Sequence, residues 1–442
     1  MRRLPTLLAA ALFASVGLMP AASARDTSVA IAVDRSKPVA VCRLRLGVTH
    51  TQYSLDPWGD PAAIAQAKAL LAPVAEFHNQ HIMGWGADNP EPAPGEYRWE
   101  SLDRRMAMIR SLGGTPVITL CAAPDWMKGG RPGDTDWSKI EVAPLPEHYA
   151  DFAALAAAVA RRYSYVKHFQ VWNEFKGFWK PSINNWDYEA YTTMYNMVYD
   201  ALKAVDPSIK VGGPYLVVEG TGSGKGGWAS EAPIRPRQWE VLNYWLSHKH
   251  GADFIVLDRG IRDFHDDHAY TPQDEMELTH WFADVARQVA LKTKLPIWWA
   301  EYYGASESPE IVAANYASIY RGWALTGLPQ VALLWSPQQS DVAHGLFTDT
   351  RQPGGGRPLP LYAVFRAFHG RFPPGTRLYQ ATSSSPSVEA LASAGHTLLI
   401  NKSAAAVDVL LDGRRQQLAG YEVRLVPARK LAARPQRGLL TP

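Results

Sequence analysis

The sequence predicts an α/β fold, a (β/α)8 TIM barrel with a small C-terminal β-sandwich domain. From residue 43 onward, short apolar or β-branched runs alternate with amphipathic helical stretches, which is the pattern of successive βαβ units. Eight such units over about 320 residues fit a barrel with inserted loops. After residue 370 the pattern changes to short alternating strands separated by turns. The length of 442 residues also exceeds what one hydrophobic core usually holds.

The N-terminus is typical of a signal peptide. Two arginines precede an apolar stretch over residues 4–19, and small residues at 22–24 offer a cleavage site. We therefore expect residues 1–24 to be removed and the mature protein to be exported, either periplasmic or secreted, without a membrane span. An uncleaved signal anchor is the alternative.

Residues 25–42 form an N-terminal segment with a strand pattern at Val29–Val33 or at Val39–Val41. This strand precedes the first barrel strand and needs a partner, so we expect it to join the C-terminal β domain. The predicted organisation is a catalytic barrel over residues 43–370, a small β-sandwich domain over 371–428 and a flexible tail over 429–442.

Each strand of the predicted barrel is followed by a helix. The strands are expected at Arg43–Thr49, His78–Trp85, Thr115–Leu120, Lys167–Trp172, Lys210–Gly213, Asp253–Leu257, Ile297–Ala300 and Gln330–Trp335. The helices are expected near residues 62–72, 100–112, 147–163, 187–205, 236–250, 274–293, 309–326 and 359–369. A doubly wound open sheet is the alternative, but no glycine-rich dinucleotide fingerprint follows the first strand.

The last strands and the cysteines follow from the same pattern. Strands of the β domain are expected at Val388–Ser393, Thr397–Asn401, Ala406–Leu411 and Tyr421–Val426. Cys42 lies where the first barrel strand begins and Cys121 where the third strand ends. Because these are opposite ends of a parallel barrel, we expect two separate thiols.

Two glutamates at the ends of predicted barrel strands are the candidate catalytic residues. Glu174 ends the run Phe-Gln-Val-Trp-Asn-Glu at the fourth strand, and Glu301 ends Ile-Trp-Trp-Ala-Glu at the seventh. Catalytic groups of parallel barrels come from the C-terminal ends of strands. Glycoside hydrolysis needs one protonated carboxyl for the leaving oxygen and one carboxylate facing the developing oxocarbenium ion. Asp258 and Asp266, after the sixth strand, are competing carboxylates.

Four segments of the chain resemble motifs of one enzyme clan. They are Trp172-Asn173-Glu174, Trp299-Ala300-Glu301, Pro124-Asp125-Trp126-Met127 after the third strand and Val211-Gly212-Gly213-Pro214 at the fifth. The first two resemble the strand 4 Asn-Glu and the strand 7 nucleophile of clan A glycoside hydrolases. All four together are similar to glycoside hydrolase family 39, the β-xylosidase and α-L-iduronidase family. The resemblance implies a retaining double displacement with Glu174 as acid/base and Glu301 as nucleophile.

The resemblance also implies substrate contacts. Asn173 would hydrogen-bond the sugar 2-hydroxyl, and Trp335 at the eighth strand would form a floor for the sugar. His268 and Tyr270 resemble the clan's His-x-Tyr, whose tyrosine approaches the nucleophile, although His265 lies so near that either histidine fits. Four further residues near strand ends either contact sugar or pack in the core: His50, Trp85, Trp126 and Trp179.

One position departs from the clan pattern. Many clan relatives have an arginine near the end of strand 2, whereas residues 78–86 contain none. A nearby cation is one way to keep a carboxylate ionised. Tyr270 or His81 would have to take over this support of Glu301.

Other classes of function fit less well. A net charge of +3 is too weak to indicate nucleic acid or an anionic membrane as the partner. The histidines and aspartates at 263–268 match no zinc motif, so we expect no metal and no other cofactor. No serine nucleophile elbow is present to indicate an esterase. The sequence favours no particular oligomeric state.

We therefore expect a retaining glycosidase that cleaves O-glycosidic bonds of an extracytoplasmic polysaccharide or oligosaccharide. The alternative is a catalytically inactive carbohydrate-binding or matrix-organising protein on the same barrel, against which the pair of glutamates argues. The glycine-rich segment 219–232 is either a lid over the site or a slack insertion.

Overall fold

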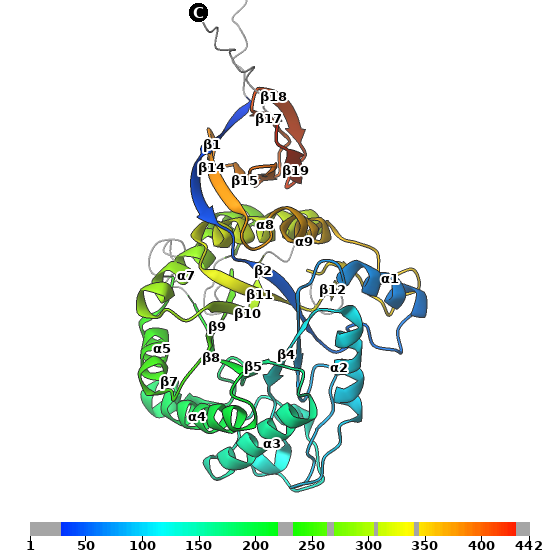
Figure 1. Cartoon of the computed structure of the whole chain (residues 1–442), viewed down its shortest axis with the longest axis vertical. Helices are drawn as coiled ribbons and strands as arrows, with labels where there is room; N and C mark the ends of the chain where they lie inside the picture. The colour runs from blue at the N-terminus through cyan, green and yellow to red at the C-terminus, as the bar shows by residue number, and fades with distance from the viewer. Residues whose placement is uncertain (1–27, 220–232, 263–268, 305–307, 340–343, 430–442) are drawn as a thin grey trace, which may run out of the picture.

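The computed structural model describes residues 28–219, 233–262, 269–304, 308–339 and 344–429. Eight parallel strands close into a barrel in the order β10-β11-β2-β3-β4-β5-β8-β9, with helices around the outside (Figure 1). The barrel strands are β2 (Arg45–His50), β3 (Phe77–His81), β4 (Thr115–Leu120), β5 (His168–Val171), β8 (Lys210–Val217), β9 (Phe254–Gly260), β10 (Ile297–Tyr303) and β11 (Pro329–Trp335). The predicted (β/α)8 barrel is confirmed.

Helices cover the barrel and short elements fill the loops above it. The α-helices are α1 (Pro61–Leu71), α2 (Glu100–Leu112), α3 (Tyr149–Arg162), α4 (Tyr188–Val205), α5 (Pro236–His248), α6 (Pro272–Leu278), α7 (His280–Lys292), α8 (Pro309–Thr326) and α9 (Pro360–Arg371). The short elements are η1 (Asp125–Lys128), η2 (Trp137–Lys139), η3 (Pro146–His148), η4 (Pro181–Ile183), β6 (Trp179–Lys180), β7 (Asn185–Trp186), β12 (Gln338–Gln339) and β13 (Phe347–Thr348). Proline begins several helices because its fixed φ and missing N–H suit the first turn.

The sequence did not predict strands β14 (Arg377–Ser383) and β18 (Arg414–Leu418), and two elements of the barrel also differ from the sequence-based expectation. The helix expected over 274–293 is divided at Thr279, whose hydroxyl donates to the carbonyl of Met276 and competes with the regular helical bond. The second barrel strand ends at His81 and not at Trp85, because the chain turns there. Trp85 itself has a φ of 48°, which a strand does not allow.

Side chains fill the barrel interior in the half where the strands begin, at their N-terminal ends. Trp298 stacks on Phe254 with ring centroids 4.1 Å apart and meets Phe77 edge-on at 5.3 Å. Above this layer a chain of buried hydrogen bonds links neighbouring strands, from Gln170 to Thr119 and on to Asn79. Because this layer fills the barrel, a site can form only at the C-terminal ends of the strands.

The second domain is a seven-stranded sheet with the order β18-β17-β1-β14-β15-β16-β19. Its strands are β1 (Val29–Val41), β14 (Arg377–Ser383), β15 (Val388–Ser393), β16 (His396–Asn401), β17 (Val407–Leu411), β18 (Arg414–Leu418) and β19 (Val423–Pro427). Residues of β1, β15, β16, β17 and β18 share one buried core, so the sheet curls over on itself. The N-terminal strand β1 lies between β14 and β17.

The two domains meet along helix α8 (Figure 1). The Ser318 hydroxyl donates to the Glu389 carboxylate at 2.7 Å, and Arg321 donates to the carbonyl of Ala390 at 2.9 Å. Within the described part of the chain, no helix combines the length and apolar character needed to cross a membrane. Cys42 and Cys121 are buried free thiols, as predicted.

Candidate active site

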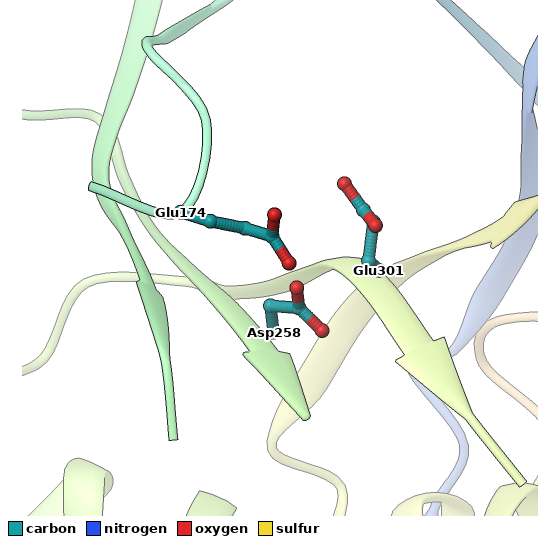
Figure 2. A group of neighbouring side chains, drawn as sticks. All are labelled: Glu174, Asp258 and Glu301. Carbon is teal, nitrogen blue, oxygen red and sulfur yellow. The ribbon is translucent and has the colours of Figure 1, made fainter. Parts of the chain in front are cut away.

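Three carboxyl groups gather at the C-terminal ends of neighbouring and facing strands (Figure 2). Glu174 follows β5, Asp258 lies in β9 and Glu301 lies in β10. One oxygen of each carboxyl group lies within 4.8 Å of one oxygen of each of the others. Glu301 and Asp258 are direct partners in the register of β9 and β10. The two glutamates expected from the sequence therefore converge, together with one of the two aspartates considered as competitors.

Irregular backbone aims these side chains. The register of β10 shifts between Trp299 and Glu301, and such a bulge redirects the residues that follow it. After β5, Trp172 and Glu174 both have positive φ, at 69° and 51°. Such angles are uncommon for residues other than glycine and cluster at functional sites. The Trp172 indole N–H, which donates to the carbonyl of Lys176 at 2.8 Å, helps to hold this turn.

Two tyrosine hydroxyls donate to Glu301. Tyr215 reaches Oε1 and Tyr303 reaches Oε2, each at 2.5 Å. Glu301 itself is only 2% exposed. Hydroxyl donors stabilise the ionised form of a carboxylate. The two tyrosines therefore favour the ionised form of Glu301, although residues 78–86 contain no arginine. Of the substitutes considered from the sequence, His81 instead contacts the Asn173 side chain at 3.3 Å.

Glu174 is held by an amide and an ammonium group. The Asn173 amide N–H donates to Glu174 Oε2 at 3.0 Å, and Lys176 Nζ lies 3.0 Å from the same oxygen. Lys176 also pairs with Glu141, which is 60% exposed at the rim. The Glu174 side chain is 21% exposed and is the most accessible of the three carboxyl groups.

Burial and mutual repulsion set the protonation of the three carboxyls. Burial and the charges of Glu301 and Glu174 raise the pKa of Asp258 well above its usual range. Burial and the charge of Glu174 raise the pKa of Glu301 to about 8, although Tyr215 and Tyr303 oppose the rise. Burial also raises the pKa of Glu174, but the hydrogen bond from Asp258 and the Lys176 ammonium outweigh it, and the net shift is downward. Since three carboxyls this close cannot all ionise, they titrate as one unit.

The carboxyls open into a hollow of about 270 Å³. Its walls include Trp85 and Trp335, whose rings meet edge to face with centroids 5.9 Å apart. Asn173, Tyr303 and Lys176 also line it. The hollow combines aromatic surface with a few convergent polar groups, which is typical of a small-molecule site.

The other candidates from the sequence are placed as follows. Trp85, Trp335 and Asn173 line the hollow. His50 is fully buried and its Nε2 lies 3.0 Å from Nδ1 of His78, so it does not reach the hollow. Trp126 is 8% exposed, and its indole N–H donates to the carbonyl of Glu91. These two residues pack inside the protein.

The remaining candidates do not line the hollow or lie outside the described residues. Trp179 is exposed on β6 against Trp186 and is not part of the lining of the hollow. Tyr270 is half-buried against the hydrophobic core of the barrel. His268, like His265 and Asp266, lies outside the described residues.

The sequence-based prediction did not include Tyr215, Tyr303 or Lys176. Lys176 lies in the turn after β5, where the spacing of a strand gives no signal. Tyr303 had a signal, because it stands two residues after Glu301 on β10, where such side chains share a face. Tyr215 had none, since the register of β8 shifts between Pro214 and Leu216 and so determines where Tyr215 points.

The three carboxyls also form the one group among the described residues whose oxygens are spaced to hold a metal ion. Lys176 already places a positive charge on Glu174 at 3.0 Å. An ammonium in that position repels a divalent cation, so the electrostatics favour proton chemistry over metal binding.

Comparisons with known proteins concern the family and the fold of the chain. The sequence model of "Glycosyl hydrolases family 39" matches residues 89–313, just over half of the chain. None of the curated proteins matches the chain. A monomeric beta-xylosidase from Caulobacter crescentus CB15 is 16% identical, with a TM-score of 0.56 over 90% of this chain and 97% of that one.

Two other solved structures have the same fold. A conserved exported protein from Bacteroides fragilis is 12% identical, with a TM-score of 0.60 over 91% of this chain and 100% of that one. The GH39 enzyme from Xanthomonas axonopodis pv. citri is 18% identical, with a TM-score of 0.55 over 87% of this chain and 77% of that one. At such identities the likeness shows the shared fold, and the family match carries the assignment.

Proposed function

Because this chain belongs to glycosyl hydrolase family 39 and is a glycosidase, we propose that it cleaves O-glycosidic bonds with retention of configuration. The spacing of the carboxyls carries the proposal. The two groups lie about 5–5.5 Å apart in retaining enzymes and about 6.5–9.5 Å apart in inverting ones. An oxygen of Glu174 lies within 4.8 Å of an oxygen of Glu301, which is closer to the retaining than to the inverting spacing.

In the first step Glu301 attacks the anomeric carbon while Glu174 gives its proton to the leaving glycosidic oxygen. The bond between the anomeric carbon and that oxygen breaks, and an ester between the sugar and Glu301 forms. In the second step Glu174 takes a proton from water, whose oxygen displaces Glu301. Asn173 beside Glu174 and the aromatic rings of Trp85 and Trp335 hold the sugar in the hollow.

Asp258 is placed to move protons between Glu301 and Glu174 before the first step. In the empty site the negative charge is more stable on Glu174 than on Glu301, whereas the first step needs the reverse. Burial favours the protonated form of Asp258, and one of its oxygens lies within 4.8 Å of an oxygen of each glutamate. We assign to Asp258 the transfer of its proton to Glu174 while it takes the proton of Glu301. The three carboxyls hold the same number of protons before and after this exchange.

Substitution of each glutamate tests the proposal. We expect Glu301→Gln to abolish turnover, because an amide does not form the glycosyl ester. We expect Glu174→Gln to reduce the rate most for substrates with poor leaving groups, by about 10²–10⁴-fold, the usual contribution of a positioned acid. Glu277→Gln on the exposed face of α6 is the matched control and should retain full activity. Full activity of the Glu301→Gln variant would contradict the proposal.

We also propose that the substrate is an extracytoplasmic polysaccharide or oligosaccharide. The support is the signal-peptide pattern of residues 1–24, which lie outside the described residues. Cell fractionation with N-terminal sequencing of the mature protein should find it outside the cytoplasm, beginning near residue 25. A protein retained in the cytoplasm with residue 2 or 3 at its N-terminus would contradict export.

A further inference from the structure

A second, larger hollow of about 900 Å³ continues from the catalytic one. The two share Trp85, Glu141 and Trp335 in their linings. Small-molecule sites span roughly 300–1,000 Å³. The catalytic hollow of about 270 Å³ lies just below this range, so it holds little more than the reacting sugar, whereas the larger hollow of about 900 Å³ is near the upper end.

Exposed tryptophans line the larger hollow. Trp58 is 61% exposed and Trp137 is 47% exposed, and they come from different loops, after β2 and after β4. Exposed apolar side chains gathered in one hollow and rimmed by polar residues mark a binding groove, whereas a single exposed side chain does not. A third tryptophan of similar exposure, Trp179 at 46%, belongs to neither lining. The flat apolar faces of Trp58 and Trp137 suit the C–H faces of sugar rings.

The loop that carries Trp58 is fixed in place from beneath. The buried Arg105 forms an ion pair with Asp56 at 2.7 Å and donates to the backbone carbonyls of Ser54 and Thr51. It also donates to the Gln80 side chain on β3 at 2.8 Å. A buried arginine with this many bonds ties the loop to the barrel, so the hollow is formed before any ligand binds.

Polar groups line the same hollow as the tryptophans. Arg104, Asp88 and Gln52 are exposed and line the same hollow. Within the described part of the chain, Arg104 forms no ion pair. Donors and acceptors interspersed with aromatic faces match the hydroxyls and C–H faces of a glycan chain better than a purely apolar or strongly charged ligand.

We propose that this larger hollow binds further sugar units of the same glycan whose reacting sugar occupies the catalytic hollow. The enzyme then acts on oligosaccharide or polysaccharide chains, and its efficiency depends on units beyond the reacting one. This inference rests on the proposed glycosidase function, and it adds where the further units of a chain substrate bind.

The test measures how the activity depends on the length of the substrate, both in the wild type and in the Trp58→Ala/Trp137→Ala variant. The probes are xylose, cellulose and galacturonate oligosaccharides from disaccharide to hexasaccharide, with aryl monoglycosides as short substrates. We expect kcat/KM of the wild type to rise with chain length. Each lost stacking contact costs up to about tenfold, so the variant should lose most of this rise and keep its activity on aryl monoglycosides. Trp179→Ala is the matched control and should behave as the wild type.

Calorimetry separates this inference from the proposed function. Hexasaccharide binding to the Glu301→Gln enzyme should be weakened by the Trp58→Ala/Trp137→Ala changes and not by Trp179→Ala. Binding without any hydrolysis by the wild type would overturn the proposed function and leave only the binding of a glycan chain to the larger hollow. Hydrolysis that is independent of chain length, or an equal loss on short and long substrates in the variant, would overturn the inference. So would failure of every hexasaccharide to bind.

Discussion

At the scale of single residues, Glu301 depends on its two tyrosine donors. Burial and the nearby charge of Glu174 raise its pKa to about 8, and the hydroxyls of Tyr215 and Tyr303 counteract the rise. This balance replaces the arginine that many clan relatives have at strand 2. The tyrosines are therefore the residues through which the ionisation of Glu301 can be changed without altering Glu301 itself.

Replacing both tyrosines by phenylalanine should raise the pKa of Glu301 further. Because Glu301 acts in its ionised form, the acid limb of the kcat/KM profile should move to higher pH, with a fall of about tenfold or more at neutral pH. A pH series of initial rates measures this shift. Tyr199→Phe on α4 is the control. An unchanged acid limb in Tyr215→Phe/Tyr303→Phe would show that the hydroxyls do not support the nucleophile.

Asp258→Asn distinguishes a proton carrier from a neutral neighbour. Asparagine keeps the size of a protonated aspartate but passes no proton between Glu301 and Glu174. We expect kcat to fall by about 10²-fold for poor leaving groups and by much less for good ones. Asp284→Asn on the outer face of α7 serves as control. Wild-type kcat on both kinds of substrate would mean that Asp258 does not carry the proton.

The residues that the sequence predicted at the site are those whose position follows from one strand end. Glu174, Glu301, Asn173 and Trp335 stand where barrel strands stop, so the repeat alone places them at the mouth. The direction of the Tyr215 side chain depends on a register shift in β8, and no local sequence pattern predicts this shift. For His50 the sequence left sugar contact and core packing both open. This histidine follows a strand as expected, but its side chain points into the protein and pairs with His78.

At the scale of elements, periodicity predicted all eight barrel strands because each is a short apolar run between turn signals. The failures occur where side chains or unusual backbone angles interrupt a pattern. Thr279 divides one helix through its bond to the carbonyl of Met276, and the positive φ of Trp85 ends the second strand early. Both are local interruptions within otherwise regular hydrophobic patterns.

The contact between α8 and the β domain is where elements far apart in sequence meet. Glu389 on β15 is largely buried and faces Arg321, Lys402 and Ser318. Burial raises the pKa of Glu389, but Arg321 and Lys402 outweigh it, so the net shift is downward. A carboxyl whose folded pKa lies below its unfolded value stabilises the protein above the unfolded pKa and loses this contribution as pH falls through the folded one.

Glu389→Gln should therefore destabilise the protein by about 1–3 kcal/mol at neutral pH, because two cations lose their partner. The difference from the wild type should shrink below about pH 4, where the native carboxyl also becomes neutral. Urea unfolding at several pH values measures both effects. Glu422→Gln, whose side chain is more exposed, is the control. A difference that persists unchanged in acid would contradict the ion-pair account.

At the scale of the whole molecule, side chains fill the barrel at the N-terminal ends of its strands, and the catalytic carboxyls lie at the C-terminal ends. The catalytic hollow and the larger hollow beside it share a wall of Trp85 and Trp335, so cleavage and chain binding occupy one continuous surface. The β domain packs on α8, and residues of its strands line neither hollow. The domain thus extends the fold without taking part in the site.

The stereochemistry of the product tests the central claim most directly. Proton NMR during the first minutes of hydrolysis records which anomer is released before mutarotation mixes the two. Because Glu174 and Glu301 have oxygens within 4.8 Å of each other, we predict that the first product has the same anomeric configuration as the substrate. Initial release of the opposite anomer would contradict the double displacement and the role of Glu301 as its nucleophile.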